Sequence, residues 1–570
     1  MKEGHLRKGN KGCLLAIGVI IILFFGILIL WALVDTITDF AKAGLLSNPS
    51  GFTAALIMIG TPIGLVSFVI YQRKKAKRQP KQQVQLTPDS VCLDTVNGTI
   101  CMGNPYRGIF IVGAAGSGKS ESIAVPLLNQ FIRQDFSGIV YDFKFPALAN
   151  DVQCFLNANR SVLKHYFLNF NNPHQSHRVN PIHPRYLTNT SFAREYAQAI
   201  ISNLMKESIK KPDFWSRSAT DLLTACIWYL KEERPDICDL PHVCAMITSS
   251  DTALLSKLQE NPTTAQMTIS IYNAMQRGAE GQTAGVVGTL QGAIAQINTP
   301  ELMYIFGADE FSLNLNNPQS PAIVTVGSYP TLATTLAPLC SLVITVATKL
   351  MNQSGKNKSF VLLDEAPTCY VPNLEILPNT GRSNRISTVL MCQDLAQLTD
   401  GYGKEKADVL FAACNNHFYG RVASSHTSEV LSKQFGKFDK VYVTENEGRN
   451  KYQVIGGHVG QSETVQERDV IRPSEFLSFG VGEFSGITVE SNAPTFRTYF
   501  KTIQRNTPGF IKERTGDIYG YYKQVRHDIN KLLDLSTGVQ QRSEKGGILN
   551  DTQTNSKTDE RGNVFDIFGD

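Results

Sequence analysis

Two long apolar runs without charge stand near the start of the chain, at residues 13–34 and 52–71. Each run is long enough to cross the hydrocarbon of a bilayer as a helix. The pattern therefore predicts a transmembrane hairpin within residues 1–81. A signal peptide is the alternative for the first run, although no small-residue cleavage site follows it. A soluble core helix is the alternative for the second run, which contains two glycines and a proline.

From residue 86 onward, short apolar runs that end in polar residues alternate with stretches of helical period. The runs are predicted to be buried strands, and their alternation with helices is typical of an α/β fold. The helix expected from Ser120 to about Gln134 contains Pro126, so it should kink or begin late. Residues 86–107 are expected to form short strands joined by turns. The main predicted strands are 108–112, 137–142, 322–326, 359–363 and 386–392, with a helix at about 332–351.

Residues 185–300 lack strand-like runs and follow helical periods, which predicts an all-α inserted domain. An α/β domain would then be built in two parts, from residues 86–184 and 301–535. The tail at 536–570 is polar, poor in aliphatic residues and net acidic from Ser543 onward. We expect it to be disordered.

Charge is unevenly placed in this chain of 570 residues, whose formal net charge is +5. Lysines and arginines precede the first apolar run and follow the second, at positions 2, 7, 8 and 11 and at positions 73, 74, 75, 77, 78 and 81. Short loops rich in these residues remain in the cytoplasm, so both termini are expected there. The cluster at 73–81 is explained by this signal and by anionic lipid, with a nucleic-acid site as the alternative.

Eleven cysteines occur without a C-x-x-C pair or a metal-like spacing, and several lie inside apolar runs. This usage indicates reduced, buried thiols in a cytosolic compartment and argues against a zinc site.

The strand at 108–112 is followed by Gly113-Ala-Ala-Gly-Ser-Gly-Lys119-Ser120, which fits the phosphate-binding P-loop. In this motif a glycine-rich turn aims backbone N–H groups at phosphates, and the next helix begins there. Lys119 is expected to reach the outer phosphates and Ser120 to hold a magnesium ion. The residues predicted to bind the nucleotide are Gly113, Ala114, Ala115, Gly116, Ser117, Gly118, Lys119, Ser120 and Glu121.

The strand at 359–363 ends in Asp364 and Glu365, the form of a Walker B strand. Asp364 is expected to hold the magnesium ion, and Glu365 to deprotonate the attacking water. The strand at 386–392 ends in Gln393, which suits a sensor of the γ-phosphate, with a plain strand cap as the alternative.

Arg382 and Arg385 stand between these two strands and are candidates for arginines that act across a subunit boundary, although surface arginines on loops are common. Asp142 and Lys144 follow the strand at 137–142. They are placed to face the nucleotide, with a strand-end salt bridge as the equal alternative.

This order of motifs resembles the type IV coupling proteins of conjugation, the TraG and TraD group, which are membrane-bound hexameric ATPases related to the FtsK and HerA motors. Less generic stretches share the resemblance: Asn180-Pro-Ile, Asp213-Phe-Trp215, Gln393-Asp-Leu-Ala-Gln-Leu with Tyr402-Gly403, Asn415-Asn416-His417, Phe435-Gly436, and Arg472-Pro-Ser-Glu475 with Gly482-Glu483. One departure is Asp142-Phe-Lys144-Phe-Pro146, where the family usually has D-P-K-G-E.

The resemblance implies a RecA-like P-loop ATPase domain with an all-α inserted domain and an N-terminal two-helix transmembrane hairpin. It implies ATP and Mg²⁺ as cofactors and a homo-hexamer at the bacterial inner membrane. The partners would be single-stranded DNA with its attached relaxase and the type IV secretion channel. Two other classes stay open: a membrane ATPase that exports protein without DNA, and a non-hydrolysing membrane adaptor.

Overall fold

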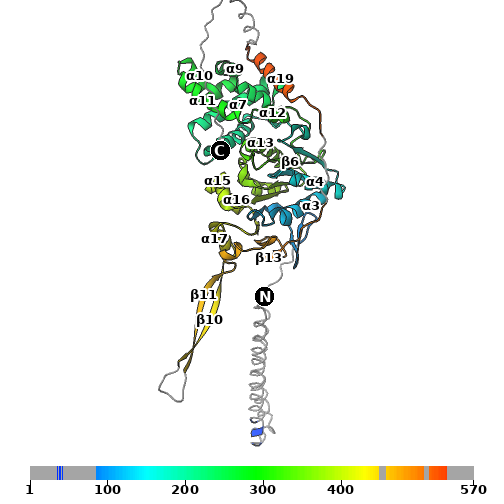
Figure 1. Ribbon diagram of the computed structural model, residues 1–570, viewed down its shortest axis with the longest axis vertical. Helices are drawn as coiled ribbons and strands as arrows, with labels where there is room; N and C mark the ends of the chain where they lie inside the picture. Colours follow the sequence, from blue (N-terminus) through cyan, green and yellow to red (C-terminus); the bar gives the residue numbers. More distant parts are fainter. Residues whose placement is uncertain are drawn as a thin grey trace, which may run out of the picture. The chain divides into compact units, whose positions relative to one another are not determined.

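The computed structural model describes residues 85–448, 458–505 and 513–535, and four single residues between 35 and 42 (Figure 1). The spans predicted at 13–34 and 52–71, their basic flanks and the tail from 536 lie outside the described residues. The chain divides into two compact units, Met1–Gln83 and Val84–Asp570, and the account below concerns the second.

A nine-stranded sheet forms the centre of this unit, with strand order β13-β12-β9-β3-β8-β7-β4-β6-β5. In this order, the seven strands from β9 through β5 are parallel to one another. At the other edge β12 is antiparallel to both β9 and β13. The α/β fold expected from the sequence is therefore confirmed, with a mixed sheet. The bounds are β3 Ile109–Val112, β4 Ser137–Asp142, β5 Lys164–Leu168, β6 Ala322–Gly327, β7 Ser359–Leu363, β8 Ile386–Cys392, β9 Asn416–Tyr419, β12 Glu483–Ile487 and β13 Thr495–Tyr499.

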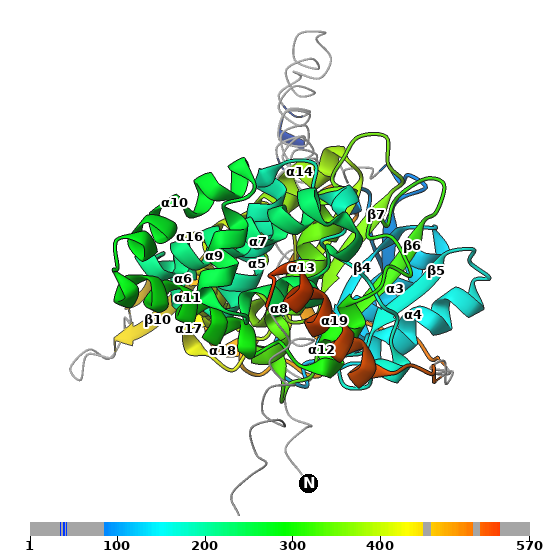
Figure 2. The same ribbon diagram turned by 90° about the horizontal axis from the view of Figure 1, so that it is seen from above.

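Apolar side chains cover both faces of the sheet, which explains why its parallel strands are continuous apolar runs. Alternate residues point to opposite faces, so Ile109 and Ile111 join one core and Phe110 and Val112 the other. The first face packs against α3 (Val125–Arg133), α4 (Ala147–Ala158) and the hairpin of β1 (Val91–Thr95) and β2 (Gly98–Met102). The second packs against α13 (Ala333–Met351), and Figure 2 shows the sheet between α13 and α4.

Between β5 and β6 the chain forms helices and short turns, in the interval where the sequence places the inserted domain. Asp213 caps the longest of these helices through a capping box with Ser216. The helices are α5 Thr190–Leu204, α6 Glu207–Lys210, α7 Phe214–Glu233, α8 Leu240–Ile247, α9 Asp251–Leu258, α10 Pro262–Gln276, α11 Glu280–Ala295 and α12 Pro300–Phe306.

The C-terminal helix α19 (Ile518–Leu532) returns to this helical part and lies against α8 and α12 (Figures 1 and 2). Tyr521 packs beside Tyr304 and above the guanidinium of Arg178. The sequence predicts residues 301–535 as the second part of the nucleotide-binding domain, and within that segment α19 contacts helices of the inserted interval. A domain boundary predicted from hydrophobic periodicity cannot show that a helix distant in the sequence packs against the helical part.

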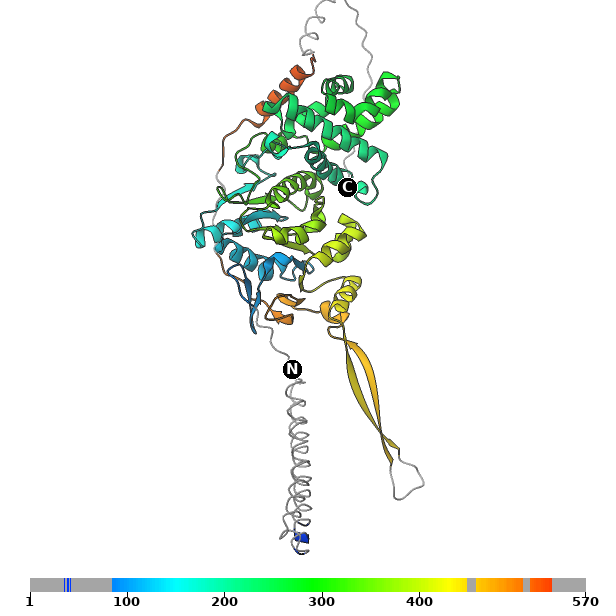
Figure 3. The same cartoon turned by 180° about the vertical axis from the view of Figure 1, so that it is seen from behind.

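The remaining described α-helices are α14 Leu377–Ser383, α15 Leu395–Tyr402, α16 Lys404–Ala413, α17 Ser425–Gln434 and α18 Pro473–Phe476. Between α17 and α18, β10 (Lys437–Gly448) and β11 (His458–Asp469) form a separate two-stranded ribbon (yellow in Figure 3).

Among the described helices, α13 alone is long and apolar enough to cross a membrane, and 78% of its apolar window is buried inside the protein. It is thus a core helix of the α/β unit.

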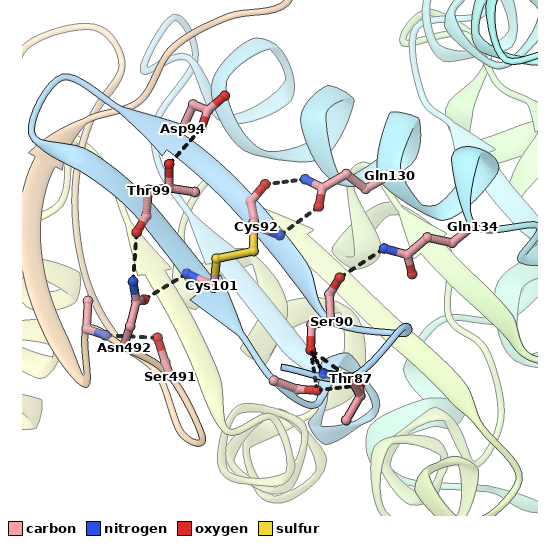
Figure 4. Close-up of a disulfide and its surroundings, with 12 residues drawn as sticks. Thr87, Ser90, Cys92, Asp94, Thr99, Cys101, Gln130, Gln134, Ser491 and Asn492 are labelled. Carbon is pink, nitrogen blue, oxygen red and sulfur yellow. Dashed lines mark hydrogen bonds between the residues drawn. A yellow bond between two sulfur atoms is a disulfide. The ribbon is translucent and has the colours of Figure 1, made fainter. Parts of the chain in front are cut away.

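A disulfide joins Cys92 and Cys101, which face each other across the β1–β2 hairpin with a Cα–Cα distance of 4.0 Å (Figure 4). This corrects the expectation that the cysteines are all reduced thiols. The hairpin turns at Val96 and Asn97, and this register places Cys92 opposite Cys101. The Asn97-Gly98 signal in the sequence favours a turn one residue later, which would not pair the two cysteines. The other described cysteines are free, and all of them except Cys154 are buried.

Candidate active site

Three parallel strands deliver the predicted motifs to one edge of the sheet. Because β8 lies between β3 and β7, the glycine turn after β3, the Asp-Glu pair after β7 and the glutamine after β8 become neighbours. Ser120 Oγ donates a hydrogen bond to Asp364 Oδ1 at 3.2 Å. Gln393 donates from its backbone N at 3.2 Å and from Nε2 at 3.1 Å to the two carboxylate oxygens of Glu365.

These residues line a cavity of about 200 Å³. Its wall consists of Ala114, Ala115, Gly116, Ser117, Gly118, Lys119, Ser120, Glu121, Phe143, Lys144, Asp364, Glu365 and Gln393.

The glycines permit the tight turn that forms one side of the cavity. Gly116 and Gly118 have φ angles of 73° and 93°, which L side chains rarely adopt. Lys119 folds back over the turn, and its Nζ donates to Gly113 O at 2.6 Å. A π-helical turn over Lys119–Ala124 precedes α3, so the regular helix begins late, as expected from Pro126.

Burial sets the electrostatics of the cavity. It raises the pKa of Asp364 to about 6, with a further contribution from the charge of Glu365. It also raises the pKa of Glu365 and lowers that of Lys119. The charged forms of these groups are therefore costly in the isolated chain, and a bound cation and polyphosphate would offset that cost.

The loop after β4 closes another side of the cavity. The carboxylate of Asp142 is fully buried, and its Oδ2 accepts a hydrogen bond from Ala149 N at 3.0 Å in the first turn of α4. Burial raises the pKa of Asp142 to about 7. Asp142 thus supports the start of α4 and does not line the cavity, whereas the exposed Lys144 does.

Arg382 and Arg385 do not reach this cavity. Both precede β8, whose seven residues span about 20 Å, and the cavity lies beyond the opposite end of that strand. Arg385 pairs with Asp89 at 3.1 Å. Arg382 is exposed and has no ion-pair partner in the described parts of the chain, although its charge acts on Glu490.

Three residues without a role predicted from the sequence contact the glycine turn or the helix that follows it. Arg421 O accepts a hydrogen bond from Ala114 N at 2.6 Å, and Gly482 N donates to Ser117 O at 2.9 Å. Arg505 binds Glu121 at 2.8 Å and also pairs with Asp151 in α4. Gly482 stood in a stretch that resembled the family, but its contact with the turn has no local sequence signal, since more than 350 residues separate them.

The fold and the cavity together define a P-loop protein of the α/β class. A family model described as Type IV secretory system Conjugative DNA transfer matches residues 71–497, and the chain belongs to this family. The resemblance drawn from the sequence motifs is thereby confirmed. No curated protein sequence matches the chain.

Solved structures of conjugative coupling proteins share the fold. The unbound bacterial conjugative coupling protein TrwBdeltaN70 has 15% identity, a TM-score of 0.58 and coverage of 76% of this chain and 93% of its own. Plasmid coupling protein TrwB with the ATP analogue ADPNP has 15% identity, a TM-score of 0.57 and coverages of 76% and 94%. TrwB with ADP and Mg²⁺ has 17% identity, a TM-score of 0.54 and coverages of 72% and 88%.

Proposed function

We propose that this protein is an inner-membrane coupling ATPase that recruits relaxase-bound single-stranded DNA and drives its transfer to a type IV secretion channel. Family membership supports the role in conjugative DNA transfer. The observation that carries the enzymatic part is the meeting of Ser120, Asp364, Glu365 and Gln393 around one cavity beside Lys119.

In this proposal the glycine turn binds the phosphates of ATP through its backbone N–H groups, and Lys119 leaves Gly113 O to contact the outer phosphates. Ser120 and Asp364 hold the metal ion, because their oxygens are the ligands that Mg²⁺ prefers and lie close enough to share it. Bound Mg²⁺ would neutralise charge on the phosphates. The complexes of TrwB with ADPNP and with ADP and Mg²⁺ support this choice of ligands.

Glu365 is the proposed general base, since it lies at the cavity and its carboxylate is held by two hydrogen bonds from Gln393. Loss of the γ-phosphate would change what Gln393 contacts, and Gln393 begins the segment that leads into α15. We infer that Gln393 passes the state of the nucleotide to this helix.

The ring itself belongs to the same proposal. Subunits would form a homo-hexamer beneath the membrane, anchored by the hairpin at 1–81 with both termini in the cytoplasm. An arginine of one subunit would complete the site of the next. Arg382 is the better candidate, because Arg385 is already held by Asp89.

DNA would be bound mainly through its phosphates, so binding should depend on salt and not on sequence.

The test is ATP hydrolysis by the full-length chain in detergent, with and without single-stranded DNA, across a salt series. We expect hydrolysis that DNA stimulates, with less stimulation at higher salt. Lys119→Ala should abolish nucleotide binding, whereas Glu365→Gln should keep it and lower kcat at least about a hundredfold. Hydrolysis without any DNA effect would favour protein export alone. Absence of both hydrolysis and nucleotide binding would favour a non-hydrolysing adaptor.

A further inference from the structure

The loop after β4 presents one lysine to the nucleotide cavity and is held firmly on both sides of it. Before the lysine, Asp142 is fully buried and binds the first turn of α4. After it, Phe145 is 5% exposed and packs against Phe167 and Tyr329. The position of the residue between these two anchors is therefore set by the fold.

Backbone contacts strengthen this support. Phe145 N donates to Ser328 O at 3.2 Å, and Ser328 N donates to Asp142 O at 2.8 Å. A Cβ at Gly327 would come within 2.7 Å of the Phe145 ring, so the strand end of β6 and the loop fit closely. With Asp142 and Phe145 both buried, Lys144 is the charged residue of this loop that lines the cavity.

Lys144 lines the cavity together with the glycine turn, Asp364, Glu365 and Gln393. Its charge acts on both carboxylates and on Lys119, which shows that the two ammonium groups share one site. The ammonium group of Lys144 has no hydrogen bond or ion pair within the described ranges, whereas its backbone O accepts from Ala147 N at 3.1 Å. Two other cations at the site are engaged, Lys119 with Gly113 O and Arg505 with Glu121.

We propose that Lys144 is a second phosphate-binding lysine, which contacts the γ-phosphate of ATP beside Glu365. This inference rests on the proposed ATPase function. Lys119 approaches from the glycine turn and Lys144 from β4, so two cations would flank the transferred group. In the step itself, water attacks the γ-phosphorus and gives its proton to Glu365. The bond to the β–γ bridging oxygen breaks, and ADP and phosphate result. Lys144 donates N–H to a γ-oxygen throughout and stabilises the charge there.

The test compares Lys144→Ala and Lys144→Arg with the full-length wild-type chain in detergent. The readouts are kcat and the dissociation constants of ADPNP and ADP in the presence of Mg²⁺. Because only ADPNP has a third phosphate, Lys144→Ala should weaken ADPNP about tenfold and change ADP less than about twofold. It should also lower kcat about tenfold or more, and Lys144→Arg should recover most of both losses.

Lys164→Ala is the matched control, since Lys164 is an exposed lysine at the opposite end of a strand of the same sheet. It should leave all three values unchanged. Equal losses for ADPNP and ADP, or wild-type values for Lys144→Ala, would overturn the role of Lys144. A wild-type chain that binds no ADPNP would instead overturn the proposed function, and Lys119→Ala supplies the reference for lost binding.

Discussion

Individual residues in the cavity have conformations or environments that are costly without a ligand. Lys119, Asp364 and Glu365 are charged groups largely removed from water, and Gly118 occupies a left-handed conformation. Such positions cluster where a site is organised for binding. The requirement for glycine at position 118 can be tested by substitution, because the atoms that an added Cβ would meet there are defined.

Gly118→Ala should destabilise the protein by about 2–3 kcal/mol and weaken ATP binding. An alanine Cβ would lie 2.9 Å from Gly482 N, in addition to the strain of the left-handed backbone. Gly278→Ala is the control, since Gly278 has a similar φ of 72° but no atom within 4 Å of the added Cβ. It should cost only about 1 kcal/mol. Chemical denaturation and nucleotide titration measure both, and equal costs for the two variants would contradict the role assigned to Gly482.

Among the elements, the β1–β2 hairpin is tied to the α/β unit in several ways at once. Gln130 of α3 accepts from Cys92 N at 2.6 Å and also donates to its carbonyl oxygen. Asn492 accepts from Cys101 N at 2.8 Å. Figure 4 shows the disulfide between these two sets of hydrogen bonds.

Reduction of the disulfide should therefore leave the hairpin paired. Replacing both cysteines by serine should lower the free energy of unfolding by about 2–3 kcal/mol, the loop-closure contribution expected for a loop of this length. Nucleotide affinity should not change, because the disulfide does not line the cavity. Denaturation with and without reductant measures the first effect, and thiol mapping by mass spectrometry establishes the pairing. A large loss of nucleotide affinity would show that the hairpin does more than support the core.

Helix α19 is the second element whose partners are distant in sequence. Ile529 is 1% exposed and belongs to the core shared with the helical part. Ile529→Asp would bury a charge there, so it should release α19 at a cost of about 3 kcal/mol. Hydrogen exchange in α8 and α12 should then increase. The exposed Lys523 on the same helix provides the control Lys523→Ser, which should leave exchange unchanged. Unaltered exchange in Ile529→Asp would mean that α19 does not stabilise these helices.

On the scale of the whole molecule, the proposed arginine of the site would have to come from a neighbouring subunit. Arg382 and the cavity lie at opposite ends of β8, so a single subunit cannot bring them together. In a closed ring of identical subunits, each interface joins two different surfaces of the chain, and we propose that these are the cavity and the surface that carries Arg382.

Mixing Arg382→Ala subunits with Lys119→Ala subunits should therefore restore part of the ATPase activity that each variant lacks alone. The restored sites are those where an intact Lys119 faces an intact Arg382 of the neighbour. Activity of mixtures at several ratios measures this. Arg385→Ala mixed in the same way should show no such recovery, because its partner Asp89 lies in the same chain. Failure of every Arg382→Ala mixture would contradict the arrangement.

Much of this protein follows from local pattern. The P-loop, the Asp-Glu strand, the Gln strand and the helical interval are all visible in the sequence, because hydrophobic periodicity and motif spacing depend on neighbouring residues. Pro126 even indicated the delayed start of α3.

Other features depend on which strands become neighbours and which distant segments return. The placement of β8 between β3 and β7 joins Gln393 to Glu365, and the hairpin register joins Cys92 to Cys101. Long-range packing also brings Gly482 to the glycine turn and α19 to α8. These contacts arise from burial of apolar surface over the whole unit, which no short stretch of sequence contains.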